Sequence, residues 1–199
     1  MCYVLSSLTI SPSIDETIVV VPDGFESAAA KIIDHYRFAK VKAIIPGGES
    51  REESVFKALL HLEKAGLKDD DIVLIQDGDR PNLSEDLIKR NLEAASEFGA
   101  AVTAVPATDS VLMSERGEFA ERYLPRKDIY LAQTPQTFKF GIILKAHRKA
   151  REEKNLVFTD DASIAQFAGF PSRLVMGSPD NVKITTEKDA KRFAKEGKE

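Results

Sequence analysis

The sequence predicts an α/β fold: a doubly wound, mostly parallel sheet with helices on both faces and a projecting antiparallel β-arm. Over residues 17–105, short apolar runs rich in β-branched residues alternate with amphipathic segments. The connections between them are short. From Pro106 the alternation stops, and short extended segments follow with no helix long enough to cover them. We therefore expect residues 106–132 to form the arm.

Hydrophobic periodicity and turn residues place the individual elements. Ser50, with Glu53 three residues later, has the pattern of a capping box, and Ser84 and Asp160 are further expected helix caps. The expected strands cover residues 17–21, 41–45, 71–76, 100–105, 173–176 and 182–185. The expected helices cover the first residues up to a stop at Ser11-Pro12, then residues 25–38, 50–66, 84–99, 140–152, 161–167 and a last segment from Thr186. The expected extended segments of the arm cover residues 110–113, 118–123 and 128–132.

Composition limits the class of protein. A chain of 199 residues with 43% hydrophobic residues fits one well-buried domain, so we expect residues 1–199 to form a single domain. No apolar run approaches the roughly 20 residues that span a bilayer. Charges of both signs are interleaved and the formal net charge is −4, which argues against a nucleic-acid binder. The single cysteine, Cys2, cannot form an internal disulfide and fits a reducing cytoplasm.

The histidines are expected to lie on the surface. His35, His61 and His147 each fall in a helix-like segment with Lys or Arg nearby. With one cysteine and scattered histidines, the sequence offers no Cys/His metal cluster.

Residues 71–81 place the most apolar strand beside the densest charge. The run Ile72–Ile75 suits a strand buried on both faces. Asp77, Asp79 and Arg80 follow at its carboxyl end, where open parallel sheets bind ligands. The alternative is an ordinary polar loop with a turn at Gly78. This stretch alone leaves both interpretations open.

Five motifs in a fixed order cover nearly the whole chain. They are residues 47–55 (GGESREESV), residues 76–81 (QDGDRP), residues 109–110 (DS), Arg126 with residues 133–138 (QTPQTF), and residues 181–186 (NVKITT). Together they resemble the 2-C-methyl-D-erythritol 4-phosphate cytidylyltransferase family and its relatives, the ribitol-5-phosphate cytidylyltransferases. The resemblance implies a Rossmann-like nucleotidyltransferase that converts CTP and a sugar-alcohol phosphate to the CDP-alcohol and pyrophosphate, with Mg²⁺.

Such a reaction needs cations rather than a covalent nucleophile. The acceptor phosphate attacks the α-phosphorus of CTP in line, so two anions must be brought together. Arginine, lysine and Mg²⁺ stabilise the charge that develops on the phosphoryl oxygens and on the leaving pyrophosphate.

The resemblance assigns roles to particular residues. The implied catalytic residues are Asp77, Arg80 and Lys183, and Asp77 would also hold the Mg²⁺. The implied residues for binding the acceptor are Asp109, Ser110, Arg126 and Thr134. The implied residues for binding the nucleotide are Gly48, Glu49, Ser54 and Gly78. Arg126 would come from the arm of the partner subunit, because the arms of this family embrace in a two-fold dimer.

Several of these positions have a plain structural alternative. Gly48 fits an ordinary strand-to-helix turn, and Lys183 fits a solvated surface lysine. Residues 159–161 match a further family motif, but we favour a helix cap there.

Four residues depart from the family pattern. Gln76 stands for the usual histidine and Asp79 for a small residue. Asp79 adds a negative charge near two anionic substrates, unless it pairs with Arg80 or points to solvent. Ser110 replaces a threonine and keeps the hydroxyl, and Glu49 is the least secure contact with the base. An acceptor other than methylerythritol phosphate, such as ribitol 5-phosphate, is therefore kept as an alternative.

The family pattern begins with a strand, a glycine-rich Ala-Ala-Gly-x-Gly-x-Arg loop and a Pro-Lys-Gln, which cradle the triphosphate. The 199 residues do not contain them, and Met1 falls in the helix that follows. Losing two cations from a phosphoryl-transfer site costs several kcal/mol of transition-state stabilisation. We expect an N-terminally truncated cytidylyltransferase that is weakly active or inactive as given. A non-catalytic dimeric binding protein is the alternative.

Overall fold

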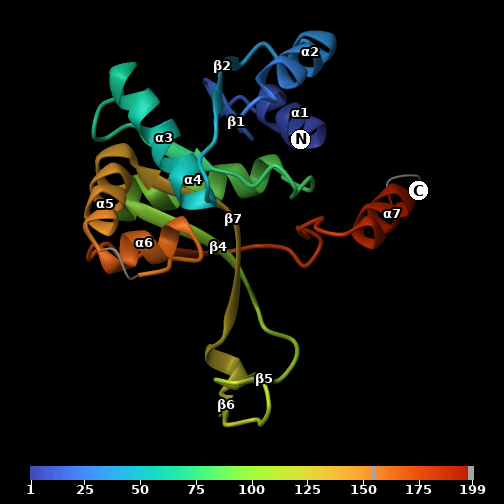
Figure 1. Ribbon diagram of the computed structural model, residues 1–199, viewed down its shortest axis with the longest axis vertical. Helices are drawn as coiled ribbons and strands as arrows, with labels where there is room; N and C mark the ends of the chain where they lie inside the picture. The colour runs from blue at the N-terminus through green and yellow to red at the C-terminus, as the bar shows by residue number, and fades with distance from the viewer. Residues whose placement is uncertain (154–155, 197–199) are drawn as a thin grey trace.

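The computed structural model describes residues 1–153 and 156–196 (Figure 1). Its helices are α1 (Cys2–Ile10), α2 (Glu26–Tyr36), α3 (Arg51–Lys64), α4 (Glu85–Phe98), the 3₁₀ turn η1 (Arg126–Asp128), α5 (Phe140–Glu152), α6 (Asp161–Phe167) and α7 (Glu187–Glu196). Its strands are β1 (Thr17–Val21), β2 (Val41–Pro46), β3 (Ile72–Ile75), β4 (Ala100–Pro106), β5 (Val111–Met113), β6 (Arg122–Leu124), β7 (Tyr130–Lys139) and β8 (Arg173–Met176).

The described strands form three sheets. The main sheet has the order β3-β7-β4-β8, with β8 parallel to β4 and β7 antiparallel to both of its neighbours. Strands β1 and β2 form a separate parallel pair, and β5 and β6 form an antiparallel hairpin. The α/β fold is confirmed, and the main sheet is mixed because of β7.

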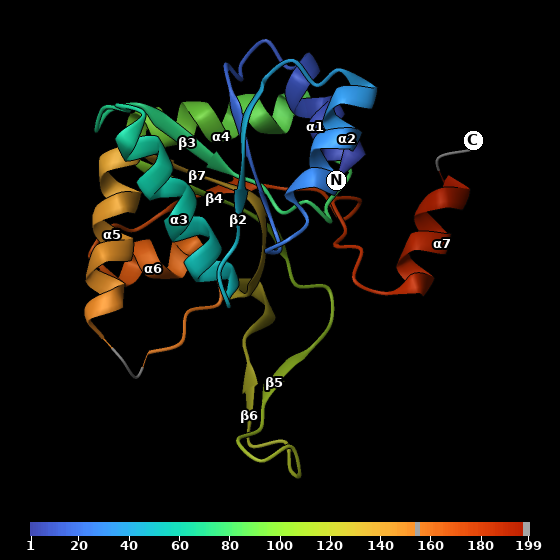
Figure 2. The same cartoon turned by 45° about the horizontal axis from the view of Figure 1, so that its top comes forward.

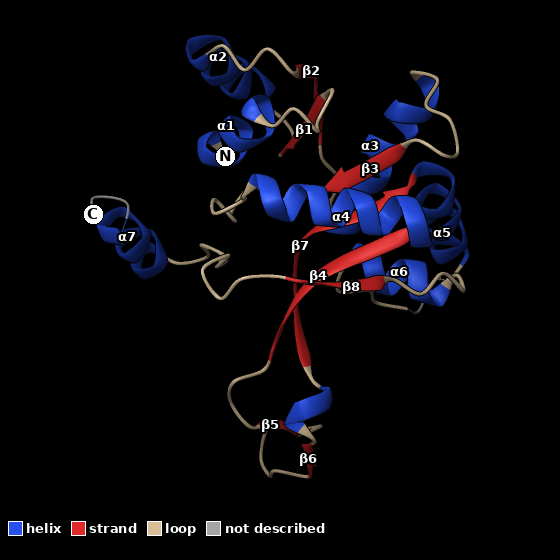
Figure 3. Ribbon diagram, turned by 180° about the vertical axis from the view of Figure 1, so that it is seen from behind, coloured by secondary structure: helices blue, strands red, loops and turns tan. Residues whose placement is uncertain are grey.

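Helices cover the main sheet on both faces (Figure 3). One face packs against α1 and α4, and the other against α3, α5 and α6. The first cluster contains Val4, Leu8, Leu83, Leu87, Ile88, Ala95, Ala101 and Val175. The second contains Leu59, Ala100, Phe138, Phe140, Ile143, Leu144 and Ala165. A third, between the β1–β2 pair and α2, contains Leu5, Val19, Val21, Ala29, Ile33 and Phe38.

Strand β7 was not predicted as one element. Only residues 128–132 were expected to be extended, whereas the first of these completes η1 and the strand runs on to Lys139. The cause is that residues 133–137 are buried although, apart from Pro135, they are polar, so they carry no hydrophobic signal. Partners distant in sequence satisfy Gln136, which donates to Asp160 Oδ2 at 2.9 Å and accepts from the Ala162 N–H at 2.9 Å.

The arm projects from the sheet as a hairpin built on β5 and β6 (Figure 2). The first extended segment is confirmed, but the second was placed too early, since the strand covers Arg122–Leu124 only. Apolar side chains stand exposed along the arm and its base. They are Leu112, Met113, Phe119, Tyr123, Tyr130 and Leu131.

The three predicted helix caps are confirmed. Ser50 Oγ accepts the Glu53 N–H at 3.0 Å, Ser84 Oγ accepts the Leu87 N–H at 3.2 Å, and Asp160 Oδ1 accepts the Ser163 N–H at 2.8 Å. The reciprocal bond of the expected capping box differs, because the Glu53 carboxylate accepts the N–H of Glu49 rather than that of Ser50.

Two local expectations were wrong. Residues 182–185 form no strand; tertiary contacts hold this segment instead, among them the 2.8 Å hydrogen bond from the Ile184 N–H to Asp79 O. His147 is fully buried rather than on the surface, because it lies on the apolar face of α5 with Ile143 and Ala150. His35 is exposed as expected, and His61 is half-buried.

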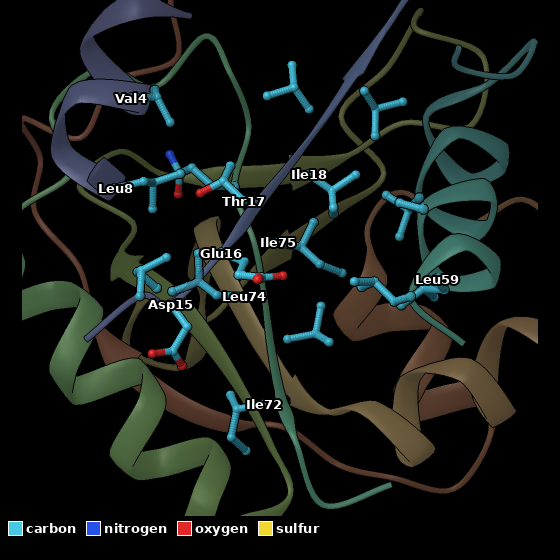
Figure 4. Close-up of a pocket in the computed structure, with 18 of the residues that line it drawn as sticks. Val4, Leu8, Asp15, Glu16, Thr17, Ile18, Leu59, Ile72, Leu74 and Ile75 are labelled. Carbon is cyan, nitrogen blue, oxygen red and sulfur yellow. The ribbon is translucent and has the colours of Figure 1, made fainter. Parts of the chain in front are cut away.

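A cavity of about 1470 Å³ separates the β1–β2 pair from the main sheet (Figure 4). Strand β1 pairs with β2 alone, and β3 with β7 alone, within the part of the chain that the structure describes. No helix in that part is both long and apolar enough to cross a membrane.

Candidate active site

The centre of the candidate site is Asp77, in the loop directly after β3. Its carboxylate side chain is only 14% exposed and lies among three cationic groups. Arg51 Nε is 3.3 Å away, Lys183 Nζ 3.2 Å and Arg80 Nε 3.6 Å. The structure thus brings Lys183, from a distant part of the chain, to Asp77 and Arg80, so the three predicted catalytic residues meet. It adds Arg51, for which no role was predicted.

Polar contacts fix the loop against β7 and the segment that carries Lys183. The Asp77 N–H donates to Thr134 Oγ1 at 3.1 Å. The buried Asn181 side chain donates to Thr134 O at 2.8 Å, and its own backbone carbonyl accepts from Arg80 Nη1 at 2.8 Å. These bonds place Lys183 beside Asp77. Lys183 is exposed, as a surface lysine would be, but its Nζ has a partner in the Asp77 carboxylate.

The two departures from the family pattern have defined contacts. Gln76 Nε2 donates to the carbonyls of Asp77 and Arg80, each at 3.2 Å, and these two hydrogen bonds stabilise the turn between them. Asp79 Oδ2 lies 3.8 Å from Lys183 Nζ. Asp79 therefore pairs with Lys183 rather than with Arg80.

The electrostatic environment keeps the central carboxylate charged. Burial disfavours ionisation of Asp77, but the positive charges of Arg51 and Lys183 outweigh it, and its pKa is lowered. Burial also opposes the charge on Arg51, yet Asp161 and Asp77 raise its pKa. Both groups are therefore ionised at neutral pH.

The predicted nucleotide-binding residues lie at the start of α3. The Gly48 N–H donates to Ser54 Oγ at 3.0 Å, and the Ser54 hydroxyl donates to Ser50 O at 2.8 Å. A Cβ at Gly48 would lie 2.4–2.5 Å from the Glu53 side chain, so only glycine fits this turn. Glu49 is exposed, and Gly78 lies in the Asp77 loop. The tight turn fits the structural interpretation, while contact with a nucleotide stays a prediction.

The other predicted acceptor residues are not gathered around Asp77. Asp109 and Ser110 are exposed where the arm begins. Arg126 lies on η1, where its guanidinium donates to Thr108 O at 3.0 Å. Of the four predicted acceptor residues, the structure places Thr134 alone in contact with Asp77.

Sequence reasoning missed a buried network behind Asp77. Arg51 Nη1 lies 2.8 Å from Asp161 Oδ2, and Asp161 Oδ1 lies 3.1 Å from His147 Nε2. Asp161 and His147 are both fully buried. The signal for His147 was its helical register on an apolar face. For Asp161, no signal separates it from the capping Asp160 beside it.

Metal binding would depend on few protein ligands. Within the described residues no group of three or more His, Cys, Asp and Glu side chains is placed to hold a metal ion. Asp77 offers a single hard oxygen donor, which fits Mg²⁺ held mainly by substrate phosphates and water.

A carboxylate and three cations at the carboxyl end of a strand, in an α/β fold with a projecting arm, define a Rossmann-like nucleotidyltransferase. Sequence comparison identifies the family. The model of the family described as "IspD: 2-C-methyl-D-erythritol 4-phosphate cytidylyltransferase" matches residues 2–194. The chain belongs to this family, whose members are cytidylyltransferases of isoprenoid synthesis.

Individual relatives agree with the family match. The chain is 40% identical over 188 residues to the 2-C-methyl-D-erythritol 4-phosphate cytidylyltransferase of Pelotomaculum thermopropionicum, covering 94% of this chain and 77% of the relative. The Clostridium botulinum enzyme of the same name is 37% identical, with 94% and 80% covered.

Solved structures of the family share the fold. The 4-diphosphocytidyl-2C-methyl-D-erythritol synthase of Anaerococcus prevotii superposes with a TM-score of 0.86 at 26% identity, covering 99% of this chain and 85% of that one. The Thermus thermophilus enzyme gives a TM-score of 0.75 at 32% identity, with 97% and 87% covered.

The network predicts strong coupling between Arg51 and Asp161. Breaking a buried ion pair from one side costs about 3–5 kcal/mol, and we expect Arg51→Met near the lower end because Arg51 is 35% exposed. The double variant Arg51→Met/Asp161→Asn should cost less than the sum of the single variants by more than about 1 kcal/mol in urea unfolding. The control is the exposed pair Arg148–Glu63, whose coupling should stay below about 1 kcal/mol. Additive costs at Arg51 and Asp161 would contradict the network.

The lowered pKa of Asp77 predicts a pH dependence of stability. A carboxyl group whose pKa is lower in the folded than in the unfolded chain stabilises the fold above the unfolded value, about 3.9. That contribution is lost as the pH falls through the folded pKa. The difference in unfolding free energy between the wild type and Asp77→Asn should therefore shift against the wild type as the pH falls from about 6 to about 3. A difference that is constant over this range would show that the charge contacts of Asp77 contribute nothing.

Proposed function

We propose that this chain binds CTP and 2-C-methyl-D-erythritol 4-phosphate, uses Mg²⁺, and acts as a homodimer joined by its β-arm. The observation that supports the proposal most is the meeting of Arg51, Arg80 and Lys183 at Asp77. Family membership supplies the reaction, in which the acceptor phosphate attacks the α-phosphorus of CTP and pyrophosphate leaves.

The cations supply what the reaction needs from the protein. Lys183 is 41% exposed and Arg80 is 12% exposed, so the lysine can turn to an incoming phosphate while the arginine stays fixed on Asn181. Thr134 adds a hydroxyl next to the Asp77 backbone. Such preorganised groups bring two anions together and need no reorganisation during the reaction.

Mg²⁺ would neutralise charge on the triphosphate when bound. Asp77 would hold it, because this ionised carboxylate is the hard oxygen ligand at the centre of the cationic groups. Arg51 and Lys183 then keep the carboxylate oriented and ionised.

Ribitol 5-phosphate is the alternative acceptor. Asp79 next to Lys183 reduces the positive potential available to a phosphate, and Gln76 cannot titrate as a histidine would. Both features act on the acceptor side of Asp77.

The cytoplasmic location expected from the single cysteine stays a prediction.

The acceptor proposal predicts which side chains decide affinity. By calorimetry with the 199-residue chain, 2-C-methyl-D-erythritol 4-phosphate should bind more tightly than ribitol 5-phosphate. Loss of a charge-assisted hydrogen bond is worth about 1.5–3 kcal/mol, so Lys183→Met should weaken binding roughly 10- to 100-fold.

The control for Lys183→Met is Lys188→Met, an exposed lysine of α7, which should leave the affinity unchanged. Pyrophosphate release from CTP, measured in the same samples, tests the expectation of weak or no turnover. Equal affinity of wild type and Lys183→Met would contradict the proposed acceptor site.

The dimer proposal rests on the arm. Phe119 and Tyr123 are 76% and 66% exposed on a hairpin without a core of its own, which favours burial against a partner. Phe119→Lys/Tyr123→Lys should convert a dimer to a monomer in light scattering. Phe25→Lys, at a 60% exposed phenylalanine outside the arm, should not. Arg126→Ala should keep the dimer and weaken acceptor binding. A wild-type chain that is monomeric at all concentrations would disprove the proposal.

A further inference from the structure

We propose that Asp161 and His147 are positioning residues of the active site, which hold the Arg51 guanidinium in the orientation that aligns the Asp77 carboxylate for Mg²⁺. The link to Mg²⁺ rests on the proposed function. The positioning of Arg51 rests on the contacts of the side chains alone.

Arg51 is the first residue of α3, a place that does not suit a cation by itself. The amino end of a helix carries a partial positive charge, which favours carboxylates and disfavours an arginine. The side chain is 35% exposed, so water competes with its protein partners. The orientation of Arg51 toward Asp77 therefore depends on partners outside α3.

Two carboxylates hold Arg51 through different nitrogens. Arg51 Nε lies 3.3 Å from Asp77 Oδ1, and Arg51 Nη1 lies 2.8 Å from Asp161 Oδ2. Because the guanidinium is planar, a contact at Nη1 fixes the direction in which Nε presents its N–H. The same contact opposes rotation about the Nε–Cζ bond, which would exchange Nη1 and Nη2. Asp161 thus sets how Arg51 meets Asp77.

His147 orients Asp161 in turn. Its Nε2 lies 3.1 Å from Asp161 Oδ1, whereas its Nδ1 is buried with no hydrogen-bond partner among the described residues. Nε2 is therefore the nitrogen that donates, and the Asp161 carboxylate accepts. The imidazole ring stacks on Phe56 of α3, with 6.1 Å between the ring centroids and an interplanar angle of 9°. The donor thus has a fixed direction.

Burial argues that this pair does more than stabilise the fold. Asp161 and His147 are both fully buried. The attraction between buried charged partners often fails to offset their desolvation, and apolar replacements of similar volume are often neutral or stabilising. Asp161 also lies in the first turn of α6, where a carboxylate suits the helix dipole, but an exposed carboxylate would do the same. What burial adds is a single orientation, which a positioning role requires.

The first test needs no ligand. It follows the guanidinium nitrogens of Arg51 by NMR in the 199-residue chain, with the signals assigned through Arg51→Lys. We expect separate Nη1 and Nη2 signals in the wild type, because rotation about Nε–Cζ is slow. Asp161→Asn keeps the shape of the side chain and removes its charge, and should speed this rotation at least about tenfold.

Two variants of His147 separate its donor from its ring. His147→Phe keeps a ring that stacks on Phe56 and removes the donor, so rotation of Arg51 should speed up at least about threefold. His147→Gln restores a donor at a similar place and should keep the rotation within about twofold of the wild type. A merely structural role would change the free energies of unfolding without this difference in the rotation of Arg51.

The matched control is Glu63→Gln. It breaks the exposed pair of Glu63 with Arg148, between α3 and α5, and should leave the signals of Arg51 unchanged.

The second test measures the binding of Mn²⁺, as a probe for Mg²⁺, together with CTP by the relaxation of water protons. Loss of a side chain that orients a metal ligand typically weakens metal binding about 10- to 100-fold, so we expect at least about tenfold weaker binding by Asp161→Asn. His147→Gln should bind Mn²⁺ as the wild type does.

Three results would overturn the positioning role: averaged Nη signals in the wild type, unchanged rotation in Asp161→Asn, or equal rotation in the two His147 variants. If Asp161→Asn does not fold, the wild-type signals and the His147 variants still decide. A wild type that binds no Mn²⁺ with CTP would contradict the metal site of the proposed function and with it the link to Mg²⁺. The signals of Arg51 would then support or overturn its positioning separately.

Discussion

The ionised carboxylate of Asp77 is the group on which the rest of the site depends. Its side chain is mostly removed from water, a position that is costly for a charge unless partners compensate. Three partners arrive from three separate segments: Arg51 from the start of α3, Arg80 from the same loop, and Lys183 from the segment before α7. Holding this one charge therefore requires that the fold bring these segments to a single point. The site is as much a consequence of tertiary structure as of any motif.

The ion pairs that stabilise the Asp77 charge continue into the core. Arg51 is shared between Asp77 and the fully buried Asp161, which in turn contacts His147 of α5. A guanidinium with two carboxylate partners is held in one orientation, since its planar donors are fixed relative to each other. The position of Asp77 is thereby tied to the packing of α5 and α6 against the sheet. A loop at a strand end is usually mobile, but ion pairs connect this loop to buried residues of the core.

The sequence predicted the parts of this architecture that apolar periodicity encodes. The β1, β3, β4 and β8 strands are mostly apolar, and their positions were found. Strand β7 was not predicted because most of its buried residues are Gln and Thr, and the burial of Gln136 depends on a partner, Asp160, that lies distant in sequence. Asp77, Arg80 and Lys183 were found through motifs. Arg51 stands inside one of these motifs but acquired a role only when the fold placed it between two carboxylates.

Strand β3, which directly precedes Asp77, differs most from what its sequence predicts. The apolar run of β3 predicts burial on both faces, whereas its residues remain partly exposed beside the cavity. Asp77 and Arg51 of α3 line the cavity, whereas Arg80 and Lys183 reach Asp77 from the Asp77 loop and from the segment before α7. The partly exposed apolar side of β3 and the charged group at its carboxyl end therefore meet at one cavity.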